Sequence, residues 1–96
     1  MYVCPTLGDD HEKDFLVIGS LDDFKIIVFS DMDEYEKGFE YLELTDYKPT
    51  EVSDELFMEL AKNDDAFNGL VLNIHSENKI ITKEESKLII IEYDSI

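Results

Sequence analysis

The sequence predicts an α+β fold, with a small mixed or antiparallel sheet of about four to five strands and two to three helices packed on it. The chain has 96 residues, which is close to the size of one compact domain. Of these residues 44% are hydrophobic and 11% are aromatic, as expected for a folded chain. Short β-branched and aromatic runs alternate with segments of helical periodicity. We therefore expect a single domain over residues 1–96.

The chain opens with an apolar stretch from Tyr2 to Leu7 that contains Pro5. Because proline has no N–H to donate to a ladder, this stretch is expected to form an edge strand. Cys4 is the only cysteine, so an internal disulfide is impossible and a reducing compartment is the simplest assumption. Its thiol is expected to be buried or merely tolerated rather than reactive.

Two runs rich in β-branched and aromatic residues, Phe15 to Ser20 and Phe24 to Phe29, predict a hairpin. In the simplest register Phe15 lies opposite Phe29, and Ser20 lies opposite Phe24 beside the turn. Both runs are almost continuously apolar. We therefore expect both faces of both strands to be covered, one of them by helices.

Ser30 is a good N-cap for a short helix after the hairpin. Three apolar side chains fall on one face of that helix: Met32, Tyr35 and Phe39. The loose alternation from Glu40 to Thr45 predicts a short strand. It is expected to end in a turn from Asp46 to Thr50, which contains Pro49.

The second half of the chain has clearer local signals. Ser53 is expected to begin a helix that ends near Asn63, with an amphipathic face formed by Leu56, Phe57, Leu60 and Ala61. The run from Gly69 to Ile74 has the pattern of a buried strand. A turn over Ser76, Glu77 and Asn78 then precedes the apolar pair Ile80 and Ile81.

Thr82 and Glu85 form a capping box, so a third helix should begin there. The apolar run from Leu88 to Ile91 either completes that helix or begins a last strand, because β-branched residues favour strands.

Three segments resemble motifs of the N-terminal domain of the SseB family: Tyr2-Val3-Cys4-Pro5, Val28-Phe29-Ser30-Asp31, and Gly69 to Asn73 followed by the capped helix. Two positions depart from the family pattern: Ile74 stands where the family usually has proline, and Pro5 is displaced by one position. The resemblance implies a non-catalytic regulatory or interaction module without an established active site. Residue chemistry suggests structural roles for Ser30, Gly69 and Asn73, as a helix cap, a point of close backbone approach and a turn residue.

The chain carries 24 carboxylates, eight lysines and no arginine, for a formal net charge of −16. Such a field repels nucleic acid and anionic membranes and speeds encounter with basic protein surfaces. We therefore expect a protein partner with a basic surface, no direct nucleic-acid binding and no membrane association. No apolar run approaches the roughly 20 residues that span a bilayer, and no signal peptide follows Met1, so a cytoplasmic protein is expected.

Catalytic constellations are missing from the sequence. His11 lies in an acidic loop and His75 in a turn, where both are expected to be surface residues. No Gly-x-Ser-x-Gly, P-loop or dinucleotide fingerprint occurs. Asp31 and Asp33 lack the glycine and distal glutamate of a calcium loop. We expect no enzyme activity, no cofactor and no metal site.

The predicted hairpin brings the segment before Phe15 beside the segment after Phe29. Eight carboxylates are then expected to share one end of the sheet, which we call the acidic pole: Asp9, Asp10, Glu12, Asp14, Asp31, Asp33, Glu34 and Glu36. This pole is the predicted partner-binding surface. Solubility is the other interpretation of the same charge.

Two functions fit this composition. The first is an SseB-like interaction domain that binds a partner protein. The alternative is a DNA mimic or immunity-type inhibitor that occupies the basic site of a nuclease or toxin. Duplex DNA carries one charge per about 1.7 Å of axis, so a mimic needs rows of carboxylates. Here the charge is clustered in predicted loops, which favours the first function. The sequence does not predict the oligomeric state.

Overall fold

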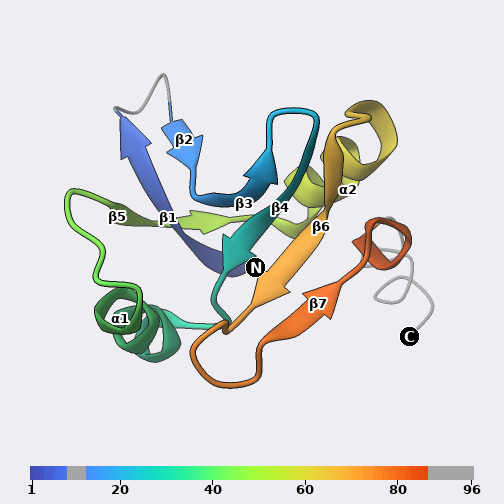
Figure 1. The fold of residues 1–96 in the computed structure, drawn as a ribbon. Coiled ribbons are helices and arrows are strands. Elements are labelled where there is room, and N and C mark those ends of the chain that lie inside the picture. Colours follow the sequence, from blue (N-terminus) through green and yellow to red (C-terminus); the bar gives the residue numbers. More distant parts are fainter. Residues whose placement is uncertain (9–12, 87–96) are drawn as a thin grey trace.

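The structure is a computed structural model and describes residues 1–8 and 13–86 (Figure 1). The elements, in chain order, are β1 (Tyr2–Gly8), β2 (Lys13–Phe15), β3 (Val17–Ser20), β4 (Asp23–Val28), α1 (Met32–Tyr41), β5 (Lys48–Val52), α2 (Asp54–Asn63), β6 (Phe67–Leu72) and β7 (Lys79–Ile81). Residues 83–86 are helical again. This arrangement confirms the α+β class. Its strands form two sheets rather than one, in the orders β2-β1-β5 and β3-β4-β6-β7.

The two sheets meet at Leu16, which lies between β2 and β3. Its N–H donates to the carbonyl of Pro5 at 3.2 Å, and its own carbonyl accepts from the N–H of Ile27 at 3.0 Å. The segment from Lys13 to Ser20 thus pairs with β1 in its first part, β2, and with β4 in its second part, β3. A second link is a bridge between Val3 and Phe29, with both backbone hydrogen bonds at 2.8 Å.

The predicted hairpin exists as β3 and β4, but its predicted register is wrong by one residue. Ser20 pairs with Asp23, and Gly19 rather than Ser20 pairs with Phe24. The connection is a two-residue turn, the commonest hairpin loop, and Asp23, which lies between the two predicted runs, belongs to β4. Phe15 belongs to β2 and pairs with Thr6 of β1 instead of Phe29.

The predicted edge strand at the N-terminus is in fact a central strand. β1 pairs antiparallel with β2 on one side and β5 on the other. Pro5 is tolerated there because it stands opposite Pro49, and neither residue has an N–H to contribute. The carbonyl of Pro5 accepts a hydrogen bond from the N–H of Leu16, so the backbone of Pro5 points away from β5. Pro5 and Pro49 therefore form a non-hydrogen-bonded pair between β1 and β5, which is why both strands tolerate proline at this position.

The predicted strand from Glu40 to Thr45 is wrong. Helix α1 continues to Tyr41, and the chain then turns through Glu43 and Asp46, whose φ angles are 53° and 69°. The predicted turn region instead supplies β5, which pairs with β1. This pairing decides the structure of a segment whose own pattern is weak. The N-cap of α1 is also shifted from Ser30 to Asp31, whose Oδ1 accepts from the N–H of Glu34 at 2.8 Å.

The local signals of the second half are confirmed. Helix α2 follows Ser53 and ends at Asn63. The predicted buried strand is β6, which lies between β4 and β7. The capping box is formed, since Glu85 N–H donates to Thr82 Oγ1 at 3.2 Å and Thr82 N–H donates to Glu85 Oε1 at 3.3 Å. The segment from Leu88 to Ile91 lies outside the described residues.

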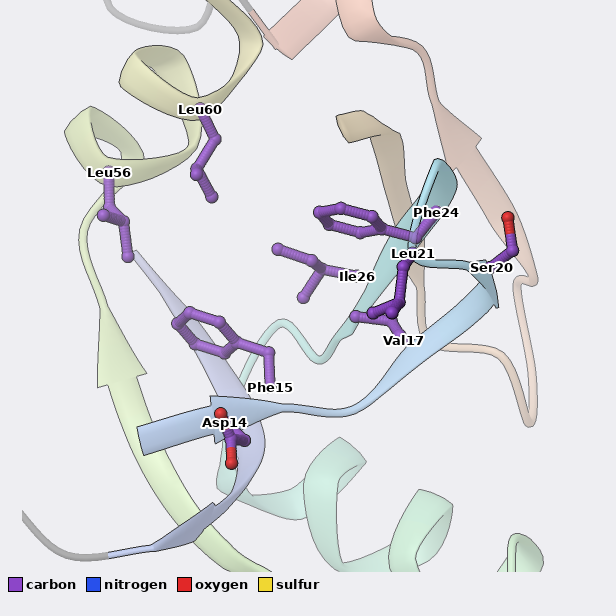
Figure 2. Close-up of a pocket in the computed structure, with 9 residues that line it drawn as sticks. All are labelled: Asp14, Phe15, Val17, Ser20, Leu21, Phe24, Ile26, Leu56 and Leu60. Atoms are coloured by element: carbon purple, nitrogen blue, oxygen red, sulfur yellow. The ribbon is translucent and has the colours of Figure 1, made fainter. Parts of the chain in front are cut away.

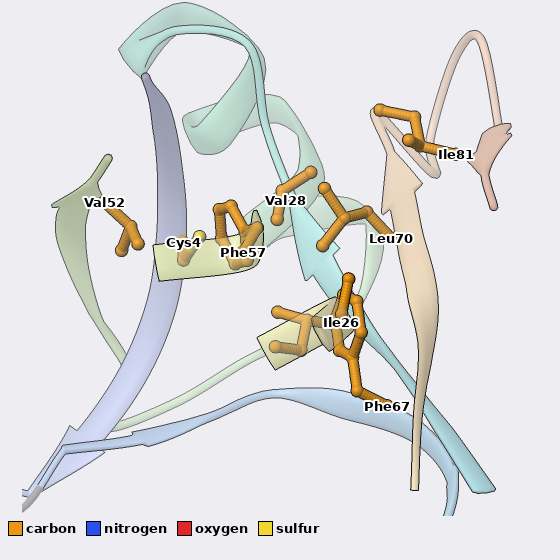
Figure 3. Packing of buried hydrophobic residues seen from close by; sticks show 9 residues of the cluster. Cys4, Ile26, Val28, Val52, Phe57, Phe67, Leu70 and Ile81 are labelled. Carbon is orange, nitrogen blue, oxygen red and sulfur yellow. The ribbon is translucent and has the colours of Figure 1, made fainter. Parts of the chain in front are cut away.

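The main core lies where α2 packs between the two sheets (Figure 3). Side chains from six elements converge there, among them Cys4, Val52, Phe57, Ile26, Leu70 and Ile81. Cys4 has no exposed surface, and burial raises its pKa from 9.0 to about 12. The expectation of a buried thiol is confirmed, and the protonated form is unreactive as a nucleophile. Within the described ranges no helix has the length and apolar character needed to cross a membrane.

Candidate functional site

Parallel strands β4 and β6 end side by side, and polar residues gather just beyond them. Asn73 is buried, and its Oδ1 accepts from the backbone N–H of Ser30 at 3.1 Å. Its Nδ2 donates to Ser30 Oγ at 3.1 Å and to Glu77 Oε1 at 3.0 Å. Asn73 also has a φ of 49°, which asparagine tolerates better than most residues. It therefore serves as a structural link between the two strand ends.

His75 lies in the predicted turn, but the expectation that it is a surface residue is wrong. Its side chain is 8% exposed, because it lies between the ring of Phe29, with centroids 5.7 Å apart, and the carboxylate of Glu34. His75 Nε2 is 2.7 Å from Glu34 Oε2 without the angle of a hydrogen bond, so the contact is an ion pair only when the ring is protonated. Ser76 Oγ donates to the same oxygen at 3.3 Å. Glu34 thus ties this turn to α1.

His11 lies outside the described residues. Among residues 1–8 and 13–86, no group of three or more histidine, cysteine or acidic side chains is arranged to hold a metal ion.

The structure divides the predicted acidic pole. Asp14 pairs with Leu7, whereas Val3, near the start of the same strand, bridges Phe29 just before α1. Four residues along a strand span about 13 Å, so Asp14 and α1 lie at opposite ends of β1 (Figure 1). The predicted juxtaposition of Asp14 with α1 is wrong, because it depended on pairing Phe15 with Phe29.

The remaining members of the pole differ in role. Asp31 caps α1 and Glu34 contacts the turn of His75, so both have structural partners. Asp33 and Glu36 are on α1, where both are exposed. Three members lie outside the described residues: Asp9, Asp10 and Glu12.

An apolar hollow that the sequence did not reveal lies between the hairpin and α2 (Figure 2). We call it the β3–α2 groove. It has a volume of about 330 Å³, and its apolar lining includes Phe15, Val17, Leu21, Phe24, Leu56 and Leu60. Leu21, at the hairpin turn, is 93% exposed, while Val17 and Leu56 on the two walls are 40% and 39% exposed.

Helix α2 explains why the groove is open. Phe57 and Ala61 point into the core and are buried, whereas Leu56 and Leu60 precede them in sequence and line the groove. The sequence predicts a single amphipathic face for these four residues. The stripe at i, i+1, i+4 and i+5 is broad enough to serve both the core and a second surface. This width was the available signal for a second apolar surface.

Strand β3 forms the other wall and is also more exposed than expected. All four of its residues are exposed, which corrects the expectation that both faces of the hairpin are covered. The reason is its place at the edge of the four-stranded sheet, where β4 is its neighbour. Val17 faces the groove, while Ile18, paired with Lys25, points to the opposite side of the strand.

Carboxylates border the β3–α2 groove. Asp14 lines it directly. Further acidic residues are exposed and adjacent in sequence to lining residues: Asp22, Glu55 and Glu59. No lysine belongs to the described lining. The ion pairs from the Met1 amino group to Asp54 and from His75 to Glu34 use no lysine. The lining itself thus carries one carboxylate, that of Asp14, and no lysine.

A smaller hollow of about 300 Å³ lies between α1 and the segment leading into β5, lined by Met32, Tyr35, Glu36, Phe39, Tyr47 and Pro49.

We compared the chain with protein-family models, with curated proteins and with solved structures, and none of them matches it.

Proposed function

We propose that this chain is a non-catalytic, acidic interaction domain that binds a partner protein with a basic surface, in the cytoplasm. The observation that supports the proposal is the β3–α2 groove, where exposed apolar side chains share the lining with the carboxylate of Asp14 and with no lysine. A soluble protein that exposes clustered apolar residues in a hollow commonly uses them for binding. The resemblance to the SseB family, which rests on sequence motifs, favours the same class of function.

Apolar contacts and charge have separate consequences in such an interface. Buried apolar anchors supply most of the binding energy and slow dissociation. Complementary charge mainly raises the association rate, and salt weakens this effect. A net charge of −16 therefore favours basic partners during encounter.

The test is to isolate the partner from the native host with the tagged protein and to reconstitute the complex from purified components. We expect a basic partner and an association rate that falls about tenfold or more between roughly 50 and 200 mM salt. A purified partner that is acidic, with an association rate insensitive to salt, would refute the proposal.

Charge reversal refines this experiment. Asp33→Lys, Glu36→Lys and Glu40→Lys change exposed carboxylates on α1. The combination should lower the association rate several-fold at low salt and change the dissociation rate less. Asp31 and Glu34 are left intact, because they cap the helix and hold the His75 turn. An unchanged melting temperature is the folding control.

The alternative function is DNA mimicry, or inhibition of a nuclease or toxin through its basic site. A short row of exposed carboxylates favours it, since Asp33, Glu36 and Glu40 follow one face of α1. At about 1.5 Å per residue this row extends about 10 Å, whereas a mimic of duplex DNA needs charge along a longer path. Displacement of the purified partner by duplex DNA, with loss of binding by the triple reversal at every salt concentration, would favour the alternative.

A further inference from the structure

Some of the exposed apolar side chains of the described residues meet at the β3–α2 groove. Three of them, Val17, Leu21 and Leu56, come from two elements distant in sequence and border the same hollow. The more buried Phe15 and Leu60 extend this apolar surface inward. The groove thus offers a continuous apolar floor with an exposed leucine or valine on each side, as Figure 2 shows.

The charge of the chain argues against two occupants. A second copy would bring another −16 to a surface that is already negative. The segment 87–96 has one lysine, Lys87, against Glu92 and Asp94, so it too is acidic. Asp14 lies in the groove itself, with Glu55 and Glu59 beside the lining residues of α2. The complementary occupant is apolar on one side and cationic at its edges.

The backbone of β3 argues against addition of a partner strand. The strand has four residues, and Gly19 within it has a φ of 120°, outside the β region. A regular edge, with alternating free N–H and C=O groups, is what strand addition requires. The groove instead presents side chains from a helix on one wall and a hairpin on the other, an arrangement that suits recognition through the apolar face of a helix.

We therefore propose that the β3–α2 groove binds an amphipathic helix of the partner, with an aliphatic stripe in the groove and lysine or arginine residues along its edges. This inference rests on the proposed function and adds the place and the form of recognition. Lysine and arginine suit the edges because their apolar stems cover the walls while their charges reach Asp14, Glu55 and Glu59.

The probe is a synthetic peptide of about 18 residues made of leucine and lysine, with leucine at positions i, i+3, i+4 and i+7, long enough to be helical. Its affinity for the whole chain is measured by isothermal titration calorimetry. Val17→Ser and Leu56→Ser should each weaken binding about tenfold, as expected for anchors in a docking groove.

Ile18→Ser is the matched control. Ile18 is the next residue on β3, is 44% exposed against 40% for Val17, and points away from the groove. It should change the affinity less than about twofold. Thermal melts of all three variants establish that each is folded. Equal losses of peptide affinity from Val17→Ser and Ile18→Ser would overturn the groove as the docking site.

Two further peptides test the helix and the charge. A peptide of the same length with a central proline should bind at least about tenfold more weakly, because proline breaks the helix. Replacing lysine with glutamate should abolish binding. Equal affinity of the helical and proline peptides would overturn the helical mode.

The outcomes separate this inference from the proposed function. If the lysine peptide binds with salt sensitivity but ignores Val17→Ser and Leu56→Ser, the groove inference fails while binding of basic proteins stands. If the peptide does not bind and the purified native partner does, the helical inference again fails alone. If the native partner is acidic and insensitive to salt, the proposed function fails as well.

Discussion

Strands β6 and β3 belong to the same sheet but have opposite surroundings. β6 lies between β4 and β7, and its Leu70 has no exposed surface. β3 lies at the edge, and its four residues are all exposed. Both segments are apolar in sequence, so composition alone does not distinguish them. An apolar residue of β6 is needed for folding, whereas an apolar residue of β3 is available for binding.

The largest expected difference comes from a carboxylate placed in each strand. Leu70→Asp should unfold the protein, because an unpaired buried carboxylate costs several kcal/mol against a total stability of about 5–15 kcal/mol. Val17→Asp should lower the free energy of unfolding by less than about 1 kcal/mol, since Val17 is already 40% exposed. Urea titration followed by circular dichroism measures both, and a cooperative transition of Leu70→Asp near the wild-type midpoint would contradict this topology.

The second difference concerns glycine. Gly69 of β6 has a φ of 111°, and a Cβ there would lie 2.2 Å from the Ile81 carbonyl oxygen of β7. Gly69→Ala should therefore cost about 3 kcal/mol or more.

Gly19 of β3 is the matched position, with a φ of 120° and a Cβ that would lie 2.2 Å from the Asp23 carbonyl oxygen. Gly19→Ala should cost less, about 1–2 kcal/mol, because the hairpin end has an open side into which the backbone can shift. If urea unfolding gave equal losses of unfolding free energy for Gly19→Ala and Gly69→Ala, the position of β3 at the sheet edge would not relieve the clash between the added Cβ and the carbonyl oxygen.

Alkaline pH should weaken the buried region through Cys4. Burial raises its pKa from 9.0 to about 12, so the unfolded state loses the thiol proton first as pH rises. The contribution of the neutral Cys4 thiol to the free energy of unfolding is fully present below pH 9.0 and is lost progressively toward pH 12. By pH ~10.5 the loss is about 2 kcal/mol. Burial also raises the pKa of Tyr35, which adds a loss of the same sign.

Cys4→Ala separates the two groups, because it removes the thiol and keeps the tyrosine. Its free energy of unfolding should fall less steeply than that of the wild type between pH 9.0 and about 12. Parallel curves for the two proteins would contradict the assignment to Cys4.

The smallest expected effect is on the charged surface. Moderate sodium chloride should raise the free energy of unfolding by less than about 1 kcal/mol, because it screens repulsion among exposed carboxylates. Calcium chloride at equal ionic strength should raise the melting temperature by a similar amount. A much larger rise with calcium at low millimolar concentration would indicate a specific cation site.

Local structure was predictable from the sequence where a few neighbouring residues determine it. The capping box of Thr82 and Glu85, the boundaries of α2 and the special backbone at Gly69 all follow from adjacent residues. The hairpin register and strand β5 depend on pairing across the chain, which local patterns do not specify.

The candidate site was harder to predict for the same reason. The acidic pole was placed by a register that the structure does not have, so Asp14 and α1 are separated along β1. The groove requires β3 and α2 to meet in space, although Leu56 and Leu60 already marked a broad apolar stripe. Fold class and charge could be anticipated, and the meeting of distant segments could not.

The most direct test is to map the leucine–lysine peptide on isotopically labelled protein by NMR. We expect the largest amide shift changes around Val17, Leu21, Leu56 and Leu60, the residues that line the β3–α2 groove. Amides of β6 near Leu70 should shift little, because that strand is enclosed by its neighbours. Changes centred on α1, or spread evenly over the acidic surface, would contradict the claim that this groove is the binding site.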